Sequence, residues 1–173
     1  MGPRQGRQGV EASFFKGRMM PDLDEVGEAG DPYDLGRFVQ AQEHDFHRAL
    51  AEIRSGRKRS HWIWYIFPQI DGLGFSEMSK RYAIKSVAEA EAYLNHPILG
   101  PRLMEIAEAV LGVEGKSALE ILGSPDDMKL RSSATLFAYV SPAGSIFDRL
   151  IGKYFQGEPD RETLRLAGAT RRD

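Results

Sequence analysis

The sequence predicts a mainly α-helical protein, folded as a single compact domain of several helices with little or no β-structure. Apolar residues recur every three or four positions through most of the chain, which is the spacing of one helix face. Serine or aspartate repeatedly stands where such a stretch begins, as expected of helix N-caps. The alternation of apolar and polar residues that is typical of half-buried strands persists nowhere.

Length and composition fit one ordinary globular domain. The chain has 173 residues, of which 42% are hydrophobic and 28% charged. The net charge of -2 argues against a nucleic-acid partner, so any anion site must be a local cluster. Cysteine is absent, which excludes disulfides and thiolate metal ligands and suits a cytoplasmic protein. No apolar run approaches the roughly 20 residues needed to cross a membrane.

The chain divides into a tail, a domain and a frayed end. Residues 1–30 are rich in Gly, Gln and Arg and then acidic, with few apolar positions, so they are predicted to be a flexible tail. The helical domain is expected over residues 31–168, and residues 169–173 are expected to fray. The first helix should run from an N-cap at Asp34 to Gly56, which can adopt the left-handed conformation that ends helices.

Later helices are predicted from their capping residues. The residues expected to begin helices are Ser76, Ser86, Ser117, Ser124, Ser145 and Asp160. Ser86 with Glu89, and Ser117 with Glu120, have the spacing of capping boxes. Residues 63–66 are the only candidate strand, and a helical turn is about equally compatible with them.

Residues 56–82 stand out because they contain both tryptophans, a basic triplet and a histidine. Arg57 and Lys58 either complement the C-terminal dipole of the first helix or form an anion clamp. Trp62 and Trp64 either pack in the core or supply a ring that stacks on a planar ligand. His61 is the candidate general base, and the alternative is a histidine bonded to the backbone.

A glycine-containing loop follows the aromatic residues. Gly72 and Gly74 would let backbone amides approach a ligand closely, with Gln69 before them. Ser76 should cap a short helix whose N-terminus points into this loop and attracts an anion. A plain turn between helices explains the same residues. From a later helix, Lys129 and Arg131 are expected to complete the pocket.

No metal site or cofactor is predicted. His44 and His47 lie three apart, but no third ligand stands at a diagnostic spacing. Asp126 and Asp127 resemble a catalytic carboxylate pair, yet their position at a helix start accounts for both.

Several ordered motifs resemble one known family. They are DPYDL at residues 31–35, RFV at 37–39, GRKRSHW at 56–62, FPQ at 67–69, GLG at 72–74, HPILGPRL at 96–103 and SPDDMKLRS at 124–132. Over about residues 31–166 the chain resembles the bacterial family catalogued as domain of unknown function 1810, often labelled calpastatin. The resemblance implies a small, mainly helical domain and transfers no catalytic residue. The calpastatin label finds no support, because that inhibitor type is disordered and repetitive.

The sequence therefore favours an uncharacterised protein that binds a small anionic or nucleotide-like ligand at residues 57–79. Arg57 and Lys58 would hold the anion, Trp62 or Trp64 would stack, and residues 72–76 would cradle the ligand, with hydrolysis left open. The alternative is a protein-interaction module in which the same aromatic and basic residues form an exposed patch. Oligomeric state is left open.

Overall fold

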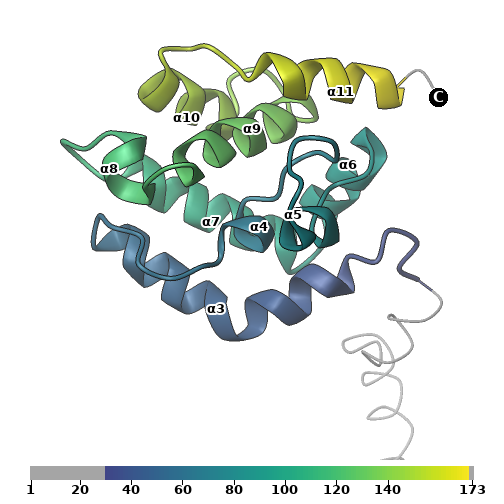
Figure 1. The fold of residues 1–173 in the computed structure, drawn as a ribbon, viewed down its shortest axis with the longest axis horizontal. Helices are drawn as coiled ribbons and strands as arrows, with labels where there is room; N and C mark the ends of the chain where they lie inside the picture. The colour runs from purple at the N-terminus through teal and green to yellow at the C-terminus, as the bar shows by residue number, and fades with distance from the viewer. Residues whose placement is uncertain (1–29, 172–173) are drawn as a thin grey trace, which may run out of the picture. The chain divides into compact units, whose positions relative to one another are not determined.

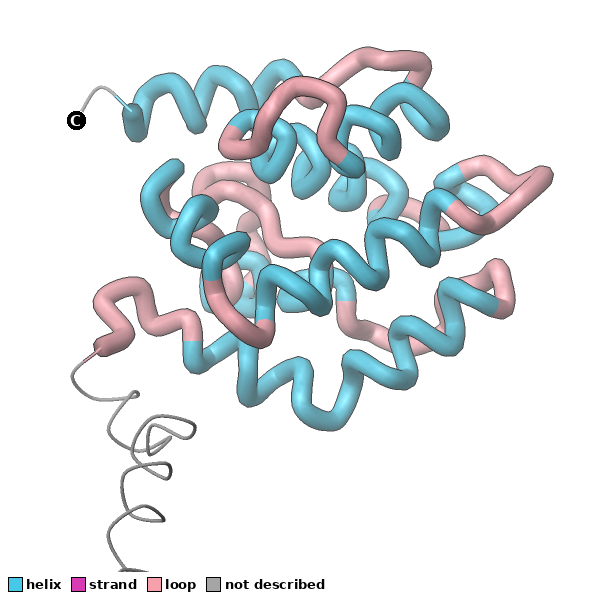
Figure 2. Tube along the Cα trace, turned by 180° about the vertical axis from the view of Figure 1, so that it is seen from behind, coloured by secondary structure: helices cyan, strands magenta, loops and turns pink. Residues whose placement is uncertain are grey.

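The computed structural model describes residues 30–171, which form helices joined by loops. The helices in this range are α3 (Gly36–Arg54), α4 (Ile63–Ile66), α5 (Glu77–Arg81), α6 (Val87–Asn95), α7 (Leu99–Leu111), α8 (Ala118–Leu122), α9 (Asp126–Tyr139), α10 (Ile146–Phe155) and α11 (Arg161–Arg171) (Figure 1). Within residues 30–171 Figure 2 shows no strand, and the only β-type pairing is an isolated bridge between Ile70 and Ile84. The predicted mainly α class is confirmed, and residues 63–66 are helical. Most of the predicted tail, residues 1–29, lies outside the described residues, as do residues 172 and 173.

Four predicted serine caps are confirmed by hydrogen bonds. Each serine side chain accepts a hydrogen bond from the backbone N–H three residues later in the chain. The four serines are Ser76, Ser86, Ser117 and Ser145. Ser117 and Glu120 form the full reciprocal box. At Ser86 the box is incomplete, because the Glu89 carboxylate accepts the N–H of Lys85 at 2.5 Å.

Two predicted caps are wrong. In residues 30–36, it is the Asp31 carboxylate that accepts the amides of Leu35 at 2.7 Å and Gly36 at 2.8 Å. Asp34 instead has a φ of 53°, in the left-handed region rather than the extended one that N-caps adopt. Before α9 the N-cap position is occupied by Pro125, so Ser124 stands one residue too early.

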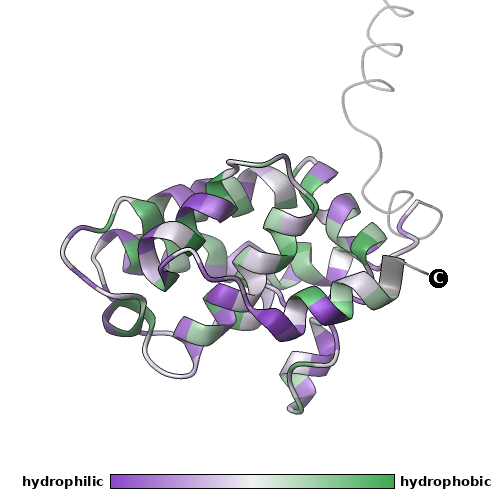
Figure 3. Cartoon of the chain, turned by 90° about the horizontal axis from the view of Figure 1, so that it is seen from above, coloured by the Kyte–Doolittle hydropathy of each residue, from purple (hydrophilic) through white to green (hydrophobic). Residues whose placement is uncertain are grey.

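Helix α9 is the centre of the packing in residues 37–171. It contacts α6, α8, α10 and α11. A series of ring contacts runs through it: Phe38 to Tyr93 at 5.1 Å, Tyr93 to Phe137 at 5.3 Å, and Phe137 to Phe147 at 5.6 Å. These rings come from α3, α6, α9 and α10, and such contacts add to the stabilisation from burial. Figure 3 shows that hydrophobic and hydrophilic residues both occur along the helices, as amphipathic helices require.

A buried ion pair fixes the first turn of α3 to α6. Arg37 Nη2 lies 2.7 Å from Glu89 Oε1, and the two side chains are 13% and 1% exposed. Arg37 also donates to the carbonyls of Arg81 at 2.9 Å and Ala83 at 2.8 Å. Both charges are thus matched by hydrogen bonds, which a buried pair requires to be stable.

We predict that Glu89→Ala lowers the free energy of unfolding by about 3 kcal/mol, because it removes a carboxylate that Arg37 contacts at 2.7 Å in a poorly solvated place. Glu91→Ala is the control, since Glu91 is exposed on the same helix. Chemical denaturation of both variants measures the difference. Equal, small losses for the two variants would contradict the prediction.

Candidate functional site

The Glu52 carboxylate, in the last turn of α3, holds the loop that follows the helix. Its Oε1 accepts the backbone N–H groups of Arg59 at 2.7 Å and Ser60 at 2.8 Å and the indole N–H of Trp62 at 3.0 Å. Its Oε2 accepts the Ser60 hydroxyl at 2.7 Å. Burial alone would raise the pKa of Glu52, but these hydrogen bonds outweigh it and lower the pKa to about 2. Glu52 therefore acts on the loop as a carboxylate at neutral pH.

Lys58 is a second anchor of the same loop. Its backbone N–H donates to the carbonyl of Ile121 at 2.7 Å. Its ammonium lies 2.8 Å from Asp126 Oδ2, with the lysine side chain 8% exposed, and 5.1 Å from the centre of the Trp62 ring. The positive charge predicted to hold an anion is thus already matched by Asp126, and Lys58 ties the loop to the first residue of α9.

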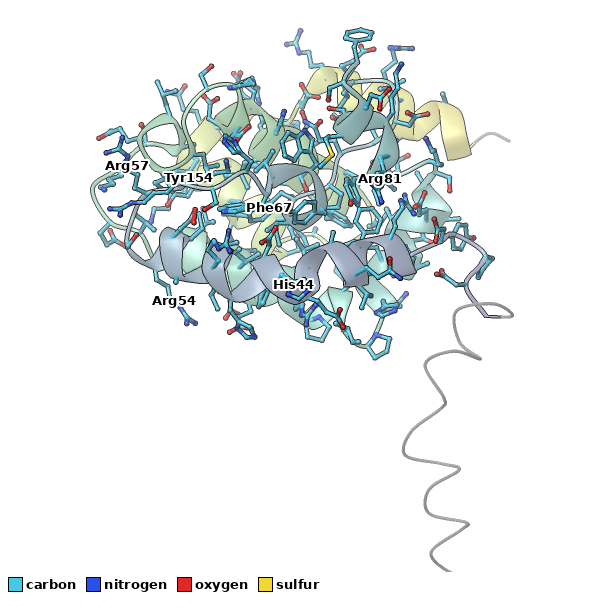
Figure 4. All side chains as sticks on the ribbon, turned by 60° about the horizontal axis from the view of Figure 1, so that its bottom comes forward. His44, Arg54, Arg57, Phe67, Arg81 and Tyr154 are labelled. Atoms are coloured by element: carbon cyan, nitrogen blue, oxygen red, sulfur yellow. The ribbon has the colours of Figure 1, made fainter. Side chains whose placement is uncertain are left out.

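The remaining predicted groups of this loop face solvent. Arg57, Arg59 and His61 are exposed, and within residues 30–171 no ion pair joins either arginine to a carboxylate. Figure 4 shows Arg57 well away from Phe67. In that range no hydrogen bond orients the His61 imidazole, so the structure supplies His61 with no partner that would position a general base.

Three predicted residues meet in a small cavity, which we call the Trp64 slot. Trp64, Gln69 and Lys129 line it together with two polar residues that the sequence did not single out, Ser79 and Tyr82. Ile63 and Phe67 supply its apolar walls. The cavity measures about 10 Å³, which is room for one water molecule or one ligand atom.

Two polar groups of the Trp64 slot, the Trp64 indole and the Lys129 ammonium, are hydrogen-bond donors only, whereas Gln69, Ser79 and Tyr82 can donate or accept. The indole N–H of Trp64 is buried and has no acceptor among residues 30–171. The Lys129 ammonium lies 5.2 Å from the centre of the Trp64 ring and 3.7 Å from Asp126 Oδ1. A buried donor left unpaired costs about 1–3 kcal/mol, so the slot favours a molecule that brings an acceptor atom.

The predicted glycine cradle contacts protein. A Cβ on Gly72, whose φ is +106°, would lie 3.3 Å from Leu166, and a Cβ on Gly74 would lie 2.4 Å from Ser79. Both positions need glycine because the loop packs closely against these side chains. Ser76 does cap the following helix, but α5 has only five residues.

Two further predicted residues lie outside the slot. Trp62 is 0% exposed, so its ring cannot stack on a ligand. Arg131 donates from Nε to the carbonyl of Glu158 at 2.9 Å and lies 5.9 Å from the centre of the Phe155 ring, which fixes the connection between α10 and α11. The residues predicted to form one pocket are therefore distributed over separate places.

The described part of the chain has neither a candidate metal cluster nor a membrane-spanning helix. There, no three His, Cys, Asp or Glu side chains are grouped so as to hold a metal ion. His44 and His47 are exposed on α3, and Figure 4 labels the first of them. No helix between residues 30 and 171 has the length and apolar character to cross a membrane.

Comparison with known proteins supports the resemblance seen in the sequence. Residues 32–167 match the family described as "Protein of unknown function (DUF1810)". The crystal structure of the conserved hypothetical protein Rv1873 from Mycobacterium tuberculosis, at 1.38 Å, is similar with 50% identity and a TM-score of 0.78. That match covers 80% of this chain and 99% of the mycobacterial chain. The search of curated proteins found no match.

Removing the indole N–H is predicted to cost more stability at Trp62 than at Trp64. Trp62→Phe removes the hydrogen bond to Glu52 and should lower the free energy of unfolding by about 1–3 kcal/mol beyond the loss from the smaller ring. Trp64→Phe removes an N–H that has no acceptor in the described part of the chain, so only the smaller loss is expected. Urea denaturation of the two variants provides the comparison. A Trp64→Phe variant that is as destabilised as Trp62→Phe would show that the Trp64 N–H has a strong partner.

Proposed function

We propose that this chain, which belongs to the DUF1810 family, binds a small anionic ligand through the Trp64 slot. The observation that carries the proposal is the buried indole N–H of Trp64, which has no acceptor within residues 30–171, on a ring whose centre lies 5.2 Å from the ammonium of Lys129. An anionic oxygen would accept from both groups. Hydrogen bonds from donors to a charged oxygen are about twice as strong as those between neutral groups.

The size of the slot limits how the ligand binds. A cavity of about 10 Å³ admits one oxygen atom of a carboxylate or phosphate, and the rest of the ligand must remain outside. Lys129 is suited to hold that ligand because its present ion partner, Asp126, is 3.7 Å away, whereas Lys58 approaches the same carboxylate to 2.8 Å. The Lys129 ammonium is therefore the more available of the two.

The interaction-module alternative is supported by one different residue. Trp62, Tyr65 and Phe67 are buried, so they do not form an exposed aromatic patch. Phe75 is 88% exposed on the loop before α5 and is the ring that a protein partner would contact. A single exposed ring is weaker support than an unpaired donor beside a cation, and we give preference to the ligand site.

A thermal-shift titration of the full chain with sodium phosphate and sodium acetate tests the proposal at constant ionic strength. At a hundredfold excess over Kd, a ligand that binds only the folded state stabilises it by about 2.7 kcal/mol, so a clear rise in Tm is expected. Lys129→Met should abolish the rise. Lys85→Met is the matched control, because Lys85 also lies 3.7 Å from its partner, Asp71, but is exposed.

Two results would contradict the ligand site. One is the absence of any rise in Tm with either anion, which would mean that the slot holds only a water molecule. The other is a rise that Lys129→Met and Lys85→Met reduce equally, which would indicate general ionic stabilisation.

A further inference from the structure

A second concave site, which the sequence analysis did not anticipate, lies where the end of α3 approaches the connection between α7 and α8. It is a hollow of about 460 Å³, within the range of small-molecule sites. Its lining includes Arg54, Ser55, Gly56, Val113, Glu114 and Lys116. We call it the Lys116 hollow. None of these residues lines the Trp64 slot, so the two sites are independent.

Cations at the rim of the hollow are available to a ligand. The Lys116 ammonium donates to the carbonyl of Gly56 at 3.0 Å, and no carboxylate within residues 30–171 pairs with it. Arg54 reaches Glu105 only at 3.6 Å, with both side chains at least half exposed. Exposed pairs of this kind contribute about 0–1 kcal/mol and exchange readily for a stronger partner.

Both helices that border the hollow present their C-terminal ends, whose carbonyl groups would repel an anion. Here the carbonyls already have partners. Lys153 donates to the carbonyls of Leu111 at 2.5 Å and Val113 at 2.8 Å. Lys116 does the same for Gly56. The negative ends of α3 and α7 are therefore compensated by lysines.

The position of Lys116 depends on a glycine. Gly56 has a φ of +85°, and a Cβ at this position would lie 2.9 Å from Lys116 Nζ. Any other residue would be strained and would displace the ammonium. The Glu52 hydrogen bonds hold the next part of the loop, at Arg59 and Ser60, so Gly56 is followed by a backbone that is already ordered. Such preorganisation lowers the entropic cost of binding.

The other lining groups indicate the class of ligand. The Glu114 carboxylate can accept hydrogen bonds from hydroxyl groups. The Ser55 hydroxyl donates to the carbonyl of Glu52 at 2.6 Å and so keeps its oxygen free as an acceptor. No aromatic side chain is among the described residues that line the hollow, so a nucleobase would find no ring to stack on.

We propose that the Lys116 hollow binds a phosphomonoester of a small sugar or polyol. Lys116 and Arg54 hold the phosphate, and Glu114 and Ser55 accept hydrogen bonds from the hydroxyl groups. This assignment rests on different residues from the Trp64 slot and does not depend on it.

Isothermal titration of the full chain with glucose 6-phosphate tests the inference, with inorganic phosphate, glucose and AMP as comparators. Glucose 6-phosphate should bind more tightly than each of the three. Lys116→Gln and, separately, Arg54→Ala should each weaken its binding at least about tenfold, because each removes a cation that holds the phosphate. Both residues are exposed, so the variants are expected to fold. Lys85→Gln, at an exposed lysine outside both sites, should leave the affinity unchanged, and repeating the titrations in Lys129→Met removes any contribution of the Trp64 slot.

Other outcomes would overturn the inference in distinct ways. Absence of binding would remove the site altogether. Equal affinity for inorganic phosphate or glucose would exclude recognition of a phosphorylated polyol, and equal affinity for AMP would exclude the proposed ligand class. Binding lost in Lys129→Met but retained in Lys116→Gln would assign the ligand to the Trp64 slot.

Discussion

The convergence of four hydrogen-bond donors on the Glu52 carboxylate is the interaction on which the local structure depends. Two of the donors are backbone amides of the loop after α3, and a third is the indole of Trp62. Without an acceptor at this place the Trp62 N–H would be unpaired in the core, at a cost of about 1–3 kcal/mol. The same contacts bring Lys58 onto the face of Trp62 and within 2.8 Å of Asp126. One carboxylate thus sets the course of the chain from the end of α3 to the start of α4.

This use of Glu52 has a consequence for the two candidate sites. Because the carboxylate is occupied by backbone and indole groups, it does not neutralise the side chains of Arg57 and Arg59, which stay exposed. The loop also joins the two sites along the sequence. Gly56, at one end, lines the Lys116 hollow, and Trp64, beyond the other end, lines the Trp64 slot. Ordering the loop therefore preorganises both sites at once.

The fold was largely predictable because its signals are local. Helical periodicity and the serine caps depend on residues three or four apart, which the sequence displays directly. The roles of Glu52, Lys58 and Arg131 were not predictable, because an acceptor or a cation at a helix end has the same pattern whether it is solvated or anchors a distant segment. Gly72 is a similar case, since its φ of +106° requires glycine and its close neighbour, Leu166, lies far along the chain. The sequence singled out Trp64, Gln69 and Lys129, which line the slot, and left open whether Trp62 packs in the core, where the structure places it.

The most direct test of this account compares the free energy of unfolding of the wild type with that of Glu52→Gln from pH 7 to pH 2. The folded-state pKa of Glu52 is about 2, against a usual value of 4.5, so its contribution should be fully present above pH 4.5 and lost as the pH falls toward 2. We predict a difference of about 1–2 kcal/mol at pH 7 that disappears at the acid end, because the amide replaces one accepting oxygen with a donor. A difference that is absent at pH 7, or that does not shrink with acid, would contradict the central role of the ionised carboxylate.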